Sequence, residues 1–76
     1  MEEFLRIIIS NLVENQEAIN IEKIENEKTV TFQVKVAKED MGRVIGRQGK
    51  LAKSIRTIMK SVATREHKKV QIEFIG

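Results

Sequence analysis

Residues 41–65 read MGRVIGRQGKLAKSIRTIMKSVATR, and most of the predictions for this chain rest on that stretch. It holds three of the four glycines, Gly42, Gly46 and Gly49, and seven basic side chains with no acidic one. Residues 1–40 carry nine acids and five bases, so the net charge of +3 conceals a strongly positive segment. An anionic partner would meet that local positive field.

Gly46-Arg47-Gln48-Gly49 is predicted to be a tight turn between two helices. Before it, Met41, Val44 and Ile45 form a short apolar face at helical spacing, and a longer face follows at Leu51, Ile55, Ile58, Met59 and Val62. Glycine permits positive φ and close approach of another group to the backbone. A helix that begins near Lys50 would point its unpaired N–H groups and positive dipole end into the turn, and such an end favours phosphate.

The rest of the chain supplies one more helix and three strands. Apolar residues at spacings of three and four predict a helix over residues 2–14. Strict alternation of apolar and polar residues predicts strands over residues 29–36 and 68–75. Residues 19–25 form a weaker strand pattern, because Ile24 breaks the alternation and suggests a bulge or an early end.

The predicted order of elements is α-β-β-α-α-β. The polar connection at residues 26–28 is short enough for an antiparallel hairpin. The two helices after residue 36 are long enough for a crossover, which places the strands at 29–36 and 68–75 parallel. We therefore expect a single α+β domain over residues 1–76, in two layers, with a three-stranded mixed sheet covered on one face by three helices.

Composition narrows the function further. The chain has 76 residues, no cysteine and only three aromatic side chains, so disulfides and a stacked aromatic platform are not expected. No apolar run approaches the length of a membrane span, and the first residues lack the basic region of a signal peptide. We expect a cytoplasmic protein whose small core gains stability from oligomerisation.

The segment VIGRQGK at residues 44–50 resembles the I-G-x-x-G core of the KH domain, a clamp over about four nucleotides. The element order resembles the type II, bacterial form of that domain. Asp40 and the residues up to Gly49, together with the later Ile-Arg-Thr-Ile segment, resemble the small bacterial KhpA family over nearly the whole chain; Met41 replaces an expected aliphatic residue. The resemblance implies sequence-tolerant binding of single-stranded RNA. It also implies a homodimer and a heteromer with a larger KH protein of the KhpB (Jag) type.

The predicted RNA-binding residues lie on the turn and its flanks, at Arg43, Ile45, Gly46, Arg47, Gln48, Gly49, Lys50 and Lys53. Arg47 and Lys50 add charge at the helix end, and Ile45 fits either an aliphatic floor for bases or the core. Arg56 and Lys60 lie further along the polar face, where a merely solvating role is open to them. Residues 55, 58, 59 and 62 are expected in the core. The predicted role is an RNA chaperone or post-transcriptional regulator.

Several alternatives to RNA binding at residues 46–49 exist, and two of them stay open. The glycines could simply end one helix and begin the next, and the turn could dock a protein instead of RNA. Duplex DNA binding is disfavoured, because the second helix lacks Asn and Gln for base readout. Leu51 follows Gly49-Lys50 where a phosphate-binding P-loop needs Ser or Thr. His67 is the only histidine and reads as a surface residue, and no nucleophile–base pair is visible, so we predict no enzyme, metal or cofactor.

Overall fold

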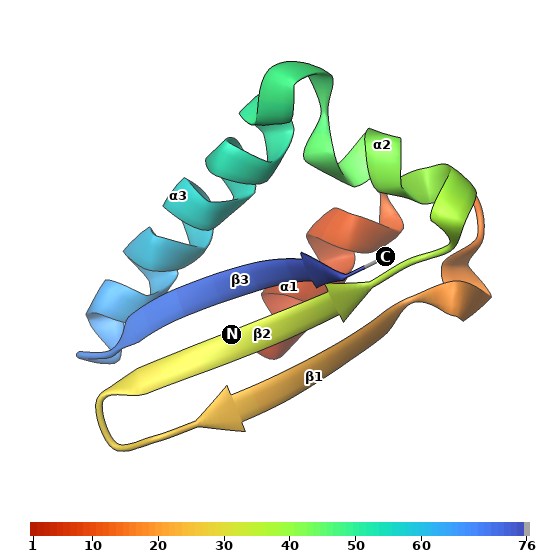
Figure 1. The fold of residues 1–76 in the computed structure, drawn as a ribbon. Helices are drawn as coiled ribbons and strands as arrows, with labels where there is room; N and C mark the ends of the chain where they lie inside the picture. Colours follow the sequence, from red (N-terminus) through yellow and green to blue (C-terminus); the bar gives the residue numbers. More distant parts are fainter. Residues whose placement is uncertain (76) are drawn as a thin grey trace.

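The alternating apolar residues of 29–36 form the central strand of a three-stranded sheet (Figure 1). In the computed structural model, which describes residues 1–75, the strands are β1 (Asn20–Glu25), β2 (Thr29–Lys35) and β3 (Lys69–Ile75). The sheet order is β1-β2-β3, with β1 antiparallel and β3 parallel to β2. The predicted α+β class, mixed sheet and element order are confirmed.

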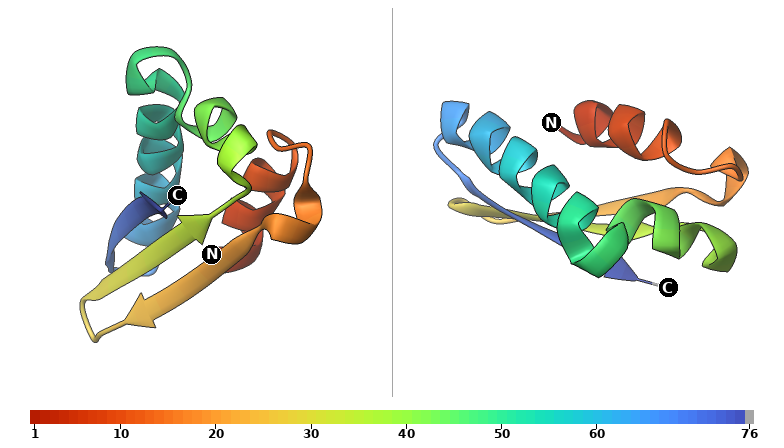
Figure 2. Two further views of the ribbon diagram at one scale, coloured as in Figure 1. Left: turned by 45° about the vertical axis from the view of Figure 1, so that its right-hand side comes forward. Right: turned by 90° about the horizontal axis from the view of Figure 1, so that it is seen from above.

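Three helices accompany the sheet: α1 (Glu2–Ser10), α2 (Met41–Ile45) and α3 (Lys50–Arg65). They share one apolar core with the sheet, whose largest fully buried side chains are Phe32, Leu5, Ile9, Ile55, Met59, Val30, Val34 and Val44. Helices α1 and α3 lie along the sheet, and α2 leads from the end of β2 to the turn that begins α3 (Figure 2). Within residues 1–75, no helix has the length and apolarity needed to cross a bilayer.

The first helix is shorter than the predicted span of residues 2–14, since α1 ends at Ser10. The Asn11 side chain donates from Nδ2 to the Ile7 carbonyl at 2.8 Å and closes the last turn. The backbone N–H groups of Glu14 and Asn15 then donate to the carboxylate of Asp40 instead of continuing the helix. A contact across 25 or more residues of sequence therefore overrides the local helical pattern.

Ile24 does not mark a bulge, and that prediction was wrong. β1 pairs with β2 without interruption from Asn20 to Glu25. Ile21 lies opposite Val34 in the core, whereas Ile24 lies opposite Thr31 on the open face and is 50% exposed. The alternation breaks because the helix-side position between them is taken by Lys23, an exposed residue that pairs with Glu25 at 3.3 Å.

Helix α3 buries a narrower face than its sequence suggested. Ala52, Ile55, Met59 and Ala63 form the buried stripe, as expected for Ile55 and Met59. Ile58 is 43% exposed, so its assignment to the core was wrong. The buried positions follow one another at spacings of three and four residues, and Ile58 lies to the side of that stripe.

Candidate nucleic-acid interface

The turn between α2 and α3 spans residues 46–49 and has three residues with positive φ. Gly46 has φ 77° and ψ 176°, Gln48 has φ 57° and ψ 27°, and Gly49 has φ 73° and ψ 10°. The Gly49 N–H donates to the Gly46 carbonyl at 3.3 Å. Helix α2 ends at Ile45 and α3 begins at Lys50, so the predicted two-helix turn is confirmed.

The two glycines of the turn meet different constraints. A Cβ on Gly46 would lie 2.5 Å from Leu51 Cβ and 2.9 Å from Leu51 N, distances at which the backbone must shift. A Cβ on Gly49 would meet nothing within 4 Å, and only its positive φ favours glycine there. Both glycines therefore have a reason in the folding of the chain, and a role in ligand binding has to rest on other features.

Basic side chains without acidic partners begin at the turn. Arg47, Lys50 and Lys53 are exposed, and none of them has a carboxylate within 4.0 Å in the described part of the chain. Lys50 and Lys53 line a shallow hollow on α3 together with Ser54, Thr57 and Ile58. Their charges stand beside the N-terminus of α3, where the helix dipole is positive.

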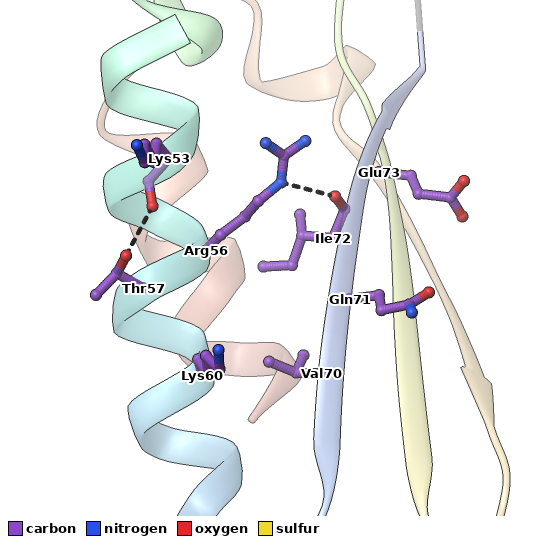
Figure 3. Close-up of a pocket in the computed structure, with 8 residues that line it drawn as sticks. All are labelled: Lys53, Arg56, Thr57, Lys60, Val70, Gln71, Ile72 and Glu73. Atoms are coloured by element: carbon purple, nitrogen blue, oxygen red, sulfur yellow. Dashed lines mark hydrogen bonds between the residues drawn. The ribbon is translucent and has the colours of Figure 1, made fainter.

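A groove between α3 and β3 continues from this end of the helix (Figure 3). Its lining residues are Lys53, Arg56, Thr57, Lys60, Val70, Gln71, Ile72 and Glu73. Arg56 reaches across the groove, where its Nε donates to the Ile72 carbonyl at 3.2 Å and its guanidinium carbon lies 5.8 Å from the centre of the Phe74 ring. Sequence reasoning left Arg56 and Lys60 with a possible solvating role, whereas the structure places both on the wall of this groove.

Arg43, in contrast, is tied to two carboxylates. Its Nη2 lies 2.9 Å from Glu14 Oε1, and its Nε lies 3.5 Å from Asp40 Oδ1. Asp40 is only 1% exposed and accepts the N–H groups of Glu14 at 3.2 Å and Asn15 at 3.1 Å. Arg43 lines neither the hollow nor the groove. Its contact with RNA stays a prediction. The two ion pairs count against it, because they already neutralise the charge that a phosphate would need.

The structural role of Asp40 was not predicted from the sequence, and the residue entered the predictions only through the family resemblance. Its partners lie 25 and 26 residues away, so no periodicity reveals them. The available signal was composition, because Asp40 is the only aspartate in the chain and directly precedes α2. A buried carboxylate normally has partners that compensate its desolvation, and here they are backbone N–H groups and an arginine.

The sequence model of a family described as KhpA/KhpB, KH domain matches residues 2–74. This chain belongs to that family. It is 43% identical to the RNA-binding protein KhpA of Clostridium perfringens over 75 residues, which cover 99% of this chain and 100% of the relative. It is 43% identical to RNA-binding protein KhpA of Listeria monocytogenes, with 99% of each chain covered, and 39% identical to that of Chlamydia trachomatis, with 99% and 96% covered. No solved structure matches the chain significantly.

Within this KH domain, the structure brings some predicted site residues together and separates others. The turn residues 46–49, Lys50 and Lys53 adjoin one another at the start of α3. Ile45 is half-buried and packs against the core beside the turn. His67 is exposed in the loop before β3, and residues 1–75 hold no group of three His, Cys, Asp or Glu side chains placed for a metal ion. The assembled features are a glycine turn, a helix N-terminus and unpaired cations.

Proposed function

We propose that this KH domain binds single-stranded RNA by holding its sugar-phosphate backbone at the turn of residues 46–49. The observation that carries the proposal is a row of cations without carboxylate partners, Arg47, Lys50, Lys53 and Lys60, which leads from the turn into the α3–β3 groove. Relatives that match the full length of the chain are named RNA-binding proteins. Family membership and local charge thus support the same ligand.

The turn suits a phosphate chiefly because of its electrostatics. Glycine at position 49 also leaves the backbone open to a nucleotide, since a side chain there would project into free space. The N-terminus of α3 adds the positive end of a 16-residue helix, beside the formal charges of Arg47 and Lys50. A KH turn of this kind covers about four nucleotides.

The groove suits the bases of the same strand. β3 is an edge strand, so one side of its backbone faces the groove without a neighbouring strand. Of the three phenylalanines, Phe32 is buried, Phe74 is half-buried and Phe4 lies on α1, so stacking contributes little. We expect affinity of micromolar order and, for three or four phosphate contacts on a single strand, a log–log salt slope of roughly −2 to −3.

The test is the double substitution Arg47→Asp with Gln48→Asp, assayed by fluorescence anisotropy on a short single-stranded RNA. We expect loss of binding, because two carboxylates at the helix end oppose a phosphate. Aspartate tolerates the positive φ at position 48 better than most residues, so the fold should persist. A matched control is Arg6→Asp with Gln16→Asp, which changes the same exposed residue types by the same charge away from the turn.

Loss of binding in the turn variant alone supports the clamp. Equal loss in both variants would mean that only net charge matters. A turn variant that unfolds, judged by circular dichroism and urea titration, would assign the turn to chain folding alone. Binding that does not respond to salt would contradict the phosphate contacts themselves.

A second function, self-association, is favoured by exposed apolar side chains on the helices. Phe4 is 47% exposed, Ile7 62% and Ile58 43%. We propose that the chain forms a homodimer through the surface around Ile58, which adjoins the hollow lined by Lys50 and Lys53. If so, Ile58→Lys yields a monomer in sedimentation, whereas Ile7→Lys does not, and excess short RNA shifts the monomer–dimer equilibrium. The reverse result would move the interface to α1.

We further infer a cytoplasmic RNA chaperone or post-transcriptional regulator that acts with a larger KhpB-type partner. A clamp on the backbone is tolerant of sequence, which suits a protein with many RNA ligands. The description of the matching family includes both KhpA and KhpB. Faster annealing of two complementary RNAs in the presence of the wild-type chain, but not of the turn variant, would support the chaperone role; equal annealing rates would count against it.

A further inference from the structure

We propose that Arg56 reads a guanine base in the α3–β3 groove, and that the domain therefore prefers single-stranded RNA with a guanosine at one position. The proposal rests on the proposed RNA binding and deepens it from a backbone clamp to a base contact. Arg56 is the one arginine among the residues that line this groove. Its surroundings differ from those of a merely solvated side chain.

Arg56 is held in place before any ligand arrives. Its Nε donates to the Ile72 carbonyl at 3.2 Å, and its guanidinium lies 5.8 Å from the Phe74 ring centre. These contacts join α3 to the edge strand and restrict a side chain that would otherwise sample many rotamers. A preorganised donor loses less conformational entropy when it binds.

The anchor leaves the recognition edge of the guanidinium free. Nε faces the strand, while the two terminal nitrogens point into the space between α3 and β3 (Figure 3). In residues 1–75 neither terminal nitrogen has a hydrogen-bond acceptor, and no carboxylate lies within 4.0 Å of Arg56. Two parallel N–H donors are therefore presented to the groove.

Guanine matches two parallel donors on its Hoogsteen edge. Its O6 and N7 atoms are adjacent acceptors there, and arginine contacts them bidentately. On the same edge adenine replaces O6 with a donor amino group, and cytosine and uracil lack the N7 acceptor. In a single strand the Watson–Crick edge of cytosine also offers two adjacent acceptors, N3 and O2, so a single-cytidine heptamer that binds as tightly as the guanosine one would overturn the choice of guanine. Nearby cations on the same wall, Lys53 and Lys60, are placed for the flanking phosphates.

The distance from the turn is compatible with one bound strand. Arg56 follows Lys50 by six residues, which is about 9 Å along a helix axis. Three steps of stacked nucleotides span about 10 Å. A strand whose backbone is held at the turn therefore reaches Arg56 within the four nucleotides that such a turn covers.

The experiment measures binding of adenosine heptamers that carry one guanosine, scanned through the positions. One register should bind about fivefold more tightly than the all-adenosine heptamer, the lower end of the range for a bidentate arginine–guanine contact because the groove is open. Replacing that guanosine with 7-deazaguanosine, which lacks the N7 acceptor, should remove the preference. Inosine, which keeps O6 and N7, should preserve it.

Two variants separate base reading from general attraction. Arg56→Lys keeps the charge but loses the planar fork, so the ratio of affinities for the guanosine and all-adenosine heptamers should fall to about one. Lys60→Gln should weaken every heptamer similarly and keep the preference. The 7-deazaguanosine comparison uses the wild-type chain, so it remains decisive even if a variant unfolds.

Three other results would overturn the assignment. The guanosine preference could be absent in the wild type, could survive 7-deazaguanosine, or could persist in Arg56→Lys. Equal weakening of all heptamers by Arg56→Lys would make Arg56 a structural or stacking residue without base selection. Failure of the wild type to bind any heptamer would instead contradict the proposed RNA binding, so the two failures are distinguishable.

Discussion

Arg43 and Arg56 flank the same glycine turn, yet they lie in opposite electrostatic environments. Arg43 is paired with Glu14 and with the buried Asp40. Arg56 has a backbone carbonyl and an aromatic ring as neighbours and faces an open groove. Closeness to the turn in sequence therefore does not decide which cations are free for a ligand. The acidic residues beside each cation decide it, and for Arg43 these are Asp40, three residues earlier, and Glu14 from a distant segment.

The Arg43 region is built to fix the direction of α2. Asp40 joins the segment after α1 to the start of α2 by accepting the N–H groups of residues 14 and 15. Arg43, one helical turn later, neutralises part of the buried charge. Because α2 leads directly into residues 46–49, this network helps to set where the turn lies relative to the sheet.

In the groove region, α3 and β3 share the apolar core, and among residues 1–75 one side-chain hydrogen bond, from Arg56 to the Ile72 carbonyl, joins them while the cations stay exposed. Residues 41–65 contain no acid, so the polar face of α3 has no neutralising partner of its own. This arrangement costs some charge repulsion, which an RNA strand would relieve. We therefore expect substitutions in the Arg43 region to change stability and those in the groove to change binding.

The largest effect should follow from Asp40→Ala. Two buried N–H groups lose their acceptor and Arg43 loses a partner, which should cost about 3 to 4 kcal/mol of unfolding free energy. Urea titration followed by circular dichroism measures it. Arg56→Ala, the matched change in the groove, should cost only about 1 kcal/mol. Equal losses of unfolding free energy in the two variants would contradict the view that the Arg43 region serves stability and the groove serves binding.

Within the turn that joins the two regions, alanine substitutions at Gly46 and Gly49 should differ in their loss of unfolding free energy. The difference should be smaller than that between Asp40→Ala and Arg56→Ala. Gly46→Ala forces a Cβ against Leu51 in addition to its positive φ, and we expect a loss of about 2 to 3 kcal/mol. Gly49→Ala meets open space and bears only the cost of positive φ, about 1 kcal/mol. The same urea titrations compare them. A larger loss for Gly49→Ala would show that the close approach of Leu51 is not what requires glycine at position 46.

The sequence was sufficient for the element order, the strand pairing and the glycine turn, because periodicity and glycine placement are local signals. It failed where contacts span the chain. The end of α1 depends on Asp40, and the environment of Arg56 depends on which edge of β3 faces α3. Ile58 escaped prediction because an apolar residue at helical spacing looks the same whether it faces the core or a partner.

A finer comparison neutralises one cation in each region. Lys53→Gln should reduce the magnitude of the log–log salt slope for single-stranded RNA by about 0.7, the value of one phosphate contact. Arg43→Gln should leave the slope unchanged if Glu14 and Asp40 neutralise the charge of Arg43 in the free protein. Glu14→Gln sharpens the test: it should raise affinity if Arg43 contacts RNA once released, and leave affinity unchanged if Arg43 serves the fold.

The smallest effect concerns an exposed acid that serves as a reference for Asp40. Glu25 lies at the end of the β1–β2 hairpin, where hydrogen bonds from Lys68 and then Lys23 lower the pKa of its carboxyl group below the usual 4.5. A carboxyl whose pKa is depressed in the folded state binds protons more readily when unfolded. Its stabilising contribution is therefore complete above pH 4.5 and is lost as the pH falls through the folded-state pKa.

Glu25→Gln should accordingly lower the urea midpoint slightly at pH 7 and have no effect at a pH where the carboxyl is protonated in both states. Because Glu25 and Lys23 are exposed and Lys68 is only partly buried, 0.5 M salt should remove most of the difference at pH 7. Salt should screen the Asp40 network far less, because that carboxylate is buried. If salt weakened Asp40 and Glu25 variants alike, relative to the wild type, burial would not be what makes the Arg43 region structural.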